Sequence, residues 1–138
     1  YSFALGKGCT LRGGSDATVI ATGMMVQMAL KAAEQLQSEG ISLRVIDMPT
    51  IKPLDEALVL QAAQETGVIV TSEEHSVIGG LGAAVAEYLS ENYPVPVIRH
   101  GVEDCFGRSG TAAAVLAHYG LTPEVLCQKV KLALSKKR

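Results

Sequence analysis

Two adjacent glutamates and a histidine, Glu73, Glu74 and His75, are the group of residues in this sequence that most resembles a chemical site. Carboxylates and an imidazole are the side chains used for acid–base catalysis and for metal binding. They follow an apolar run at 68–70 that is typical of a strand, and they stand in the predicted loop between this strand and a helix. Neighbouring side chains along a chain leave the backbone in different directions. Three consecutive residues therefore cannot all point one way. The spacing favours a plainer interpretation: one carboxylate caps the coming turn, one is solvated and the histidine packs locally.

A glycine-rich turn, GGLG at 79–82, follows this group and leads into a helical pattern. The stretch 79–85 resembles half of a dinucleotide-binding fingerprint, but Val85 stands where glycine or alanine is needed. A tight strand-to-helix turn is the favoured interpretation. In an open α/β sheet, ligands and partners bind at loops that follow the carboxyl ends of strands, and glycines let another backbone approach. The sequence thus predicts an interaction-prone loop at 73–82.

A second candidate site is an anion site formed by Arg108, Ser109, Gly110 and Thr111. These residues lead into a short predicted helix at 111–118, whose free N–H groups could hold an anion together with the arginine. Simple capping of the helix by Ser109 explains the same residues at least as well, so both interpretations stay open.

The remaining histidines and the cysteines suggest no further chemistry. His100 and His118 are expected to lie at the surface or to cap helices. The cysteines, Cys9, Cys105 and Cys127, are odd in number and have no C-x-x-C spacing. This pattern indicates neither a disulfide framework nor a zinc site, and it favours a reducing, cytoplasmic setting.

Composition is typical of one soluble domain. Apolar residues make up 48% of the 138 residues and charged residues 19%, which is enough to build a core. The net charge of −2 gives no electrostatic reason to expect nucleic acid or an anionic membrane as a partner. No apolar run approaches the length of a membrane span. The chain begins at Tyr1, so we expect a domain excised from a longer protein or a chain that lacks its leader.

Strand and helix patterns alternate along the sequence. Short apolar runs predict strands at 9–12, 17–21, 43–46, 68–70 and 97–99, and helical spacing predicts helices at 24–36, 56–66, 81–89, 111–118 and 123–134. Asp55 and Thr122 are expected to cap helices, and Gly40 and Gly67 to end them. Buried strands with short connections predict an α/β domain with a mostly parallel sheet, helices on both faces and an antiparallel first strand at the edge.

The strand residues expected to form the core share a β-branched apolar side chain and a central position in the predicted sheet. We expect the following to be almost fully buried: Val19, Ile20, Val45, Ile46, Ile69, Val70 and Val97.

Five segments of the sequence resemble the C-terminal domain of transketolase: ATGMMVQMALKAAEQL, GISLRVIDMPTIKPLD, IVTSEEHSVIGGLGAAVAEYL, DCFGRSGT and YGLTPEVL. They occur in that family's order and spacing and cover about residues 6–134. The combination of IKPLD with EEH-x-x-x-GGLG is specific for this domain type, which also occurs in deoxyxylulose-phosphate synthase and in the beta subunits of 2-oxoacid dehydrogenases. The DMPTIKPLD, EEH and FGRSG stretches are more similar to transketolase, particularly to the bacterial kind that is split into two subunits.

This resemblance implies a three-layer α/β/α domain, spanning 1–138, with a five-stranded mixed sheet and one antiparallel edge strand. It also implies a thiamine-diphosphate and Mg²⁺ enzyme of carbohydrate metabolism that moves two-carbon ketol units between sugar phosphates. In the family the cofactor lies between diphosphate-binding and pyrimidine-binding domains of two subunits, and neither domain matches this chain. The resemblance therefore implies no catalytic, cofactor-binding or metal-binding residue here.

The role that the resemblance does imply is domain packing and dimer contact through the 73–82 loop. The residues expected to serve it are Glu74, His75, Gly79, Gly80 and Gly82. The expected partners are the pyrimidine-binding and diphosphate-binding domains or subunit of the same enzyme, in a homodimer or heterotetramer.

Two classes of function stay open from the sequence. One is the C-terminal domain of a transketolase or of a related thiamine-diphosphate enzyme. The other is a regulatory module that binds an anion near Arg108 and Ser109 at the carboxyl edge of the sheet. A native reading frame that extends upstream into a pyrimidine-binding domain would favour the first.

Overall fold

A computed structural model describes residues 6–76, 80–102 and 120–137. The strands are β1 (Cys9–Arg12), β2 (Ala17–Ala21), β3 (Leu43–Asp47), β4 (Ile69–Ser76) and β5 (Val97–Val102). The helices are α1 (Met25–Gln37), α2 (Glu56–Thr66), α3 (Leu81–Asn92) and α5 (Pro123–Ser135). The helix predicted at 111–118 lies outside the described residues.

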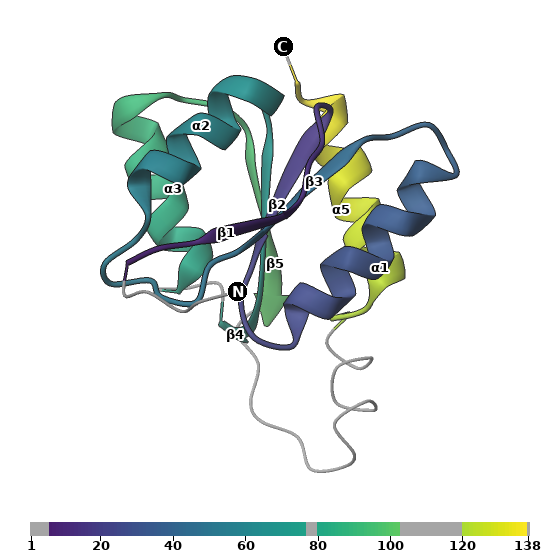
Figure 1. The fold of residues 1–138 in the computed structure, drawn as a ribbon, viewed down its shortest axis with the longest axis horizontal. Helices are drawn as coiled ribbons and strands as arrows, with labels where there is room; N and C mark the ends of the chain where they lie inside the picture. The colour runs from purple at the N-terminus through teal and green to yellow at the C-terminus, as the bar shows by residue number, and fades with distance from the viewer. Residues whose placement is uncertain (1–5, 77–79, 103–119, 138) are drawn as a thin grey trace.

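The strands form one sheet in the order β1-β3-β2-β4-β5. β1 pairs antiparallel with β3, and the other neighbouring strands pair in parallel. α1 and α5 cover one face of this sheet, and α2 and α3 cover the other (Figure 1). The predicted three-layer α/β/α class, with an antiparallel strand at one edge, is therefore confirmed.

Alternation along the strands divides the core into two layers. On β4, Ile69 packs in the cluster with α2 and α3, and Val70 packs in the cluster with α1 and α5. The other predicted core residues on β2 and β3 are also fully buried. Val97 is an exception, because it is partly exposed. It lies on β5, which is an edge strand rather than a central one, so the prediction for Val97 was wrong.

The predicted helix ends at Asp55, Thr122 and Gly67 are also found, whereas α1 ends with Ser38 as its C-cap and Gly40 lies two residues beyond it. Asp55 Oδ1 accepts a hydrogen bond from Leu58 N at 3.2 Å, and Thr122 Oγ1 accepts one from Val125 N at 3.3 Å. Gly67 ends α2 with a φ of +79°, a left-handed conformation that favours glycine. None of the helices in the part of the chain that the structure describes is long and apolar enough to cross a membrane.

Candidate functional site

At the carboxyl ends of the neighbouring strands β2 and β4, the chain leaves the sheet toward opposite faces. The two strands are neighbours, but β2 leads into α1 on one face of the sheet and β4 leads into α3 on the other. In open α/β sheets this topological switch point is the usual place for a ligand. It is also where the N-termini of the two helices present N–H groups that suit a phosphate or another anion.

The N-terminus of α3 is already occupied by Glu73. This side chain is 1% exposed, and its two carboxylate oxygens accept hydrogen bonds from Leu81 N and Gly82 N, each at 2.8 Å. Gly80 holds the N-cap position and has no side chain with which to cap the helix. The negative charge of Glu73 also interacts favourably with the positive end of the helix dipole. Glu73 therefore serves as the cap that the α3 sequence lacks.

The N-terminus of α1 is occupied in the same way by Glu74, which lies on the opposite face of β4. Its Oε1 accepts a hydrogen bond from Met24 N at 2.7 Å. Met24 holds the N-cap position and makes no side-chain cap of its own. Gly23 makes room for this contact, because a Cβ there would collide with Glu74 Oε1 and its φ is +55°. Glu74 thus joins β4 to the turn that begins α1.

The two glutamates confirm one part of the interpretation made from the sequence and change another. Glu73 is the carboxylate that caps the coming turn, as predicted. Glu74 is partly exposed, but it also binds a helix fifty residues earlier in the chain, a role that was not predicted. His75 continues β4, and its local packing stays a prediction. At this switch point the carboxylates of the protein occupy the positions that suit an anion.

The stretch 73–82 was predicted to be a loop, but residues 73–76 continue β4 and residues 81–82 begin α3, so the prediction was wrong at both ends. The glycines of this stretch, still called the 73–82 loop below, differ in what they do. Gly80 has a φ of −98° in the extended region, which other residues adopt without strain. Gly82 is buried inside α3, and a Cβ there would lie 2.8 Å from Thr71 Oγ1 and from Arg99 Cγ. Its lack of a side chain lets α3 approach β4 and β5 of the same domain. Gly79 lies outside the described residues.

The predicted anion site falls entirely outside the described residues, which do not include Arg108, Ser109, Gly110 or Thr111. The anion site and its alternative, capping by Ser109, both stay predictions.

His100 is buried rather than at the surface, which corrects the expectation from the sequence. It is 2% exposed and lies on the α5 side of β5. Its Nδ1 is 2.9 Å from Ser72 Oγ, and its Nε2 donates to the carbonyl oxygen of Gly120 at 2.7 Å. A carbonyl oxygen accepts hydrogen bonds, so Nε2 carries the proton. His100 therefore ties β4 and β5 to the residue that leads into α5.

The described residues offer no cluster of three or more His, Cys, Asp and Glu side chains that could hold a metal ion. Cys127 is buried, and this burial raises the pKa of its thiol, with the Glu39 carboxylate adding to the effect. A thiol in this setting stays protonated and is a poor nucleophile. At the described carboxyl edge, Glu73 and Glu74 link β4 to the starts of α3 and α1.

Comparison with known proteins decides the family. Residues 6–126 match the family "Transketolase, C-terminal domain". The chain belongs to this transketolase family. Among its relatives is the 6-deoxy-6-sulfo-D-fructose transketolase subunit SqwH of Clostridium sp. (strain MSTE9), which is 52% identical over 87% of this chain and 37% of the relative. Another is a subunit of the apulose-4-phosphate transketolase of Phocaeicola vulgatus, which is 48% identical over 99% of this chain and 43% of the relative.

A solved structure agrees with this assignment. A split-gene transketolase, in an inactive beta4 tetramer, matches the whole of this chain with a TM-score of 0.96 and 51% sequence identity. The match covers 45% of that protein. The chain thus spans less than half the length of the transketolase relatives that it matches.

Proposed function

We propose that this chain is the C-terminal domain of a thiamine-diphosphate-dependent transketolase that moves two-carbon ketol units between sugar phosphates. The observation that carries the proposal is the match of the whole chain to less than half of a split-gene transketolase. Within that enzyme the domain serves packing and assembly and supplies no catalytic group. The glutamates at the switch point support the absence of a catalytic group, because Glu73 and Glu74 are bound to the starts of α3 and α1 within the domain.

The described residues do not fit a magnesium diphosphate. Such a group needs oxygen ligands that converge on the metal or a cradle of free main-chain N–H groups. The acidic side chains at the switch point are committed to the two helix N-termini, and these helix ends are where an N–H cradle would form. We therefore assign the cofactor to the other domains of the complete enzyme.

The proposed partners are the remaining domains of the enzyme, namely a pyrimidine-binding domain and a diphosphate-binding domain or subunit. The names of the relatives support an enzyme of several subunits, since two of them are named as transketolase subunits and one as a split-gene beta4 tetramer. Those names also specify different sugars, a sulfofructose and apulose 4-phosphate. We propose ketol transfer in the cytoplasm as the function of the complete enzyme.

An assay of ketol transfer tests the proposal. We expect the complete enzyme, with its upstream domain and any separate diphosphate-binding subunit, to transfer a two-carbon unit from a ketose phosphate to an aldose phosphate. The 138-residue chain alone should show no activity above the buffer control. A complete enzyme that binds thiamine diphosphate but transfers no ketol unit would refute the transketolase assignment. It would favour another enzyme that uses the same cofactor.

Replacing Gly80 with valine tests the proposed contact role of the 73–82 loop. The φ of Gly80 is extended, so valine brings no left-handed strain, and its cost to the isolated domain should be that of a poor N-cap residue, about 1 kcal/mol. A side chain at a contact surface blocks close approach, so assembly or activity of the complete enzyme should fall much more. Gly82→Val is the matched control, because its Cβ would meet Thr71 and Arg99 within the domain. Equal losses of domain stability and of assembly for Gly80→Val would indicate a purely local folding role.

A further inference from the structure

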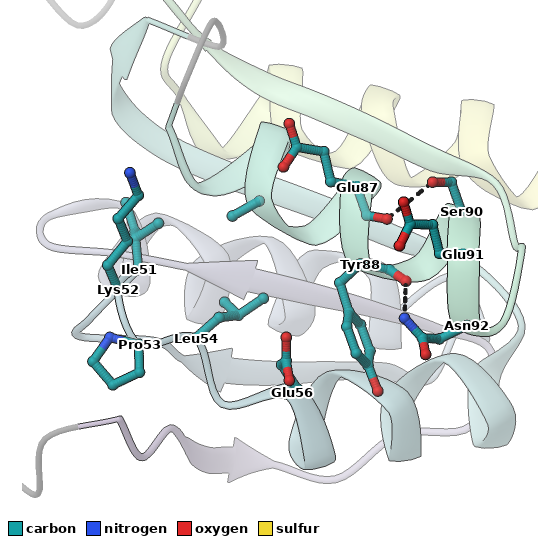
Figure 2. Close-up of a pocket in the computed structure, with 11 residues that line it drawn as sticks. Ile51, Lys52, Pro53, Leu54, Glu56, Glu87, Tyr88, Ser90, Glu91 and Asn92 are labelled. Carbon is teal, nitrogen blue, oxygen red and sulfur yellow. Dashed lines mark hydrogen bonds between the residues drawn. The ribbon is translucent and has the colours of Figure 1, made fainter.

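A groove lies between α3 and the segment 51–56 that leads into α2. Its volume is about 730 Å³, and its lining comes from these two parts of the chain (Figure 2). In Figure 2 the Tyr88 side chain extends from α3 toward the start of α2, and Leu54 lies between α3 and Pro53. The groove is thus distinct from the switch point that Glu73 and Glu74 close.

The floor of the groove is continuous with the core. Ile51, Leu54 and Tyr88 are each partly exposed, and each packs against the apolar cluster between the sheet and the α2 and α3 helices. The core on this face therefore reaches the surface through the groove. Apolar side chains gathered in a concave surface with a polar rim mark a binding site for another protein segment.

The rim of the groove is mainly acidic. The exposed side chains of Glu56, Glu87 and Glu91 line it, and Lys52 is the basic residue among the lining. A matching surface carries a lysine or arginine beside an apolar side chain. The groove does not match the same groove on a second copy of the chain. A twofold contact would bring the glutamates of the two rims opposite one another, and their like charges would repel.

The start of the described chain lies against the same 50–55 segment. Gly6 N donates to Thr50 Oγ1 at 3.2 Å, and Gly8 N donates to Asp55 Oδ2 at 2.9 Å. A Cβ on Gly6 would come within 2.8 Å of Pro53 Cγ. The residues at the start of the described chain are therefore attached to the same segment that forms one wall of the groove. A domain joined through Gly6 is held close to the groove, which gives it a high effective concentration there.

We propose that the groove between 51–56 and α3 is the docking site for the upstream domain of the same polypeptide. That domain would insert an apolar side chain over Leu54 and Tyr88, and a lysine or arginine beside it would meet the glutamates of the rim. The proposal rests on the proposed function, which places an upstream domain before this one. The upstream domain would thus contact a surface separate from the 73–82 loop. The 73–82 loop would make the contacts between subunits.

Photo-crosslinking in the complete enzyme tests the docking site. A benzophenone-bearing phenylalanine replaces Glu87 on the rim of the groove, and in a matched control it replaces Glu34, which is exposed on α1 on the other face of the sheet. We expect position 87, but not position 34, to form a cross-link to the upstream domain within the same polypeptide. Adding Glu91→Lys should reduce the yield from position 87, whereas adding Glu34→Lys should not.

Cross-links from position 87 to a second copy or to another subunit would overturn the chosen occupant. No cross-link from position 87, in a protein that retains ketol transfer, would show that the groove is open and would overturn the docking site. Neither result affects the proposed function, because ketol transfer is assayed separately on the same samples and tests that function directly. A native polypeptide without an upstream domain would refute the proposed function itself, and its mass reveals this before any cross-linking.

Discussion

Replacing Ile69 with alanine should lower the free energy of unfolding by about 2–5 kcal/mol. Ile69 is fully buried at the start of β4, and its register neighbours are Thr18 on β2 and Val97 on β5. The helices α2 and α3 cover it, so the removed methyl groups leave a cavity that the packed layers cannot fill. Chemical denaturation of the folded domain measures the loss.

The control for Ile69→Ala is Val97→Ala, at the neighbouring position on the edge strand. Val97 is partly exposed, so removing its methyl groups creates less cavity, and we expect a loss of about 1 kcal/mol. A loss below about half a kilocalorie per mole for Ile69→Ala, within the range of an ordinary surface change, would contradict the central position of β4.

Replacing Glu73 with alanine should cost about 2–4 kcal/mol, because two buried N–H groups at the start of α3 lose a charged acceptor. Water cannot easily replace the carboxylate, since the side chain is almost completely buried. Glu73→Gln keeps one acceptor oxygen and removes the charge, so its cost should be smaller, about 1–2 kcal/mol. Urea denaturation of the three proteins gives the order.

The surface control for Glu73 is Glu34→Ala on α1, which should change the free energy of unfolding by less than about 0.5 kcal/mol. Equal costs for Glu73→Ala and Glu34→Ala would show that the cap of α3 contributes no stability. Equal costs for Glu73→Ala and Glu73→Gln would show that hydrogen bonding by the remaining oxygen does not matter.

Much of the fold could be predicted from local sequence because its signals are local. Short apolar runs and helical spacing located the described strands and helices, and Asp55 and Thr122 cap the helices that directly follow them. Val97 was misjudged because an apolar run looks the same in a central strand and in an edge strand. Strand order decides between them, and strand order depends on contacts between distant parts of the chain.

The site was harder to predict because its contacts are long-range. Adjacent glutamates in a sequence do not show that Glu73 binds α3 and that Glu74 binds α1. A signal was nevertheless present: Met24 and Gly80 begin their helices without a capping side chain, and two carboxylates alternate on a strand nearby. No local sequence pattern predicts the groove, because its walls come from segments about thirty residues apart in the sequence.

The most direct test of this account is a calorimetric titration with thiamine diphosphate and Mg²⁺, made in parallel on the complete enzyme and on the 138-residue chain. Circular dichroism checks beforehand that the isolated chain is folded. We expect saturable binding by the complete enzyme and no saturable binding by the isolated chain. Saturable binding in the micromolar range by the isolated chain would contradict a domain that packs and assembles but leaves the cofactor to its partners.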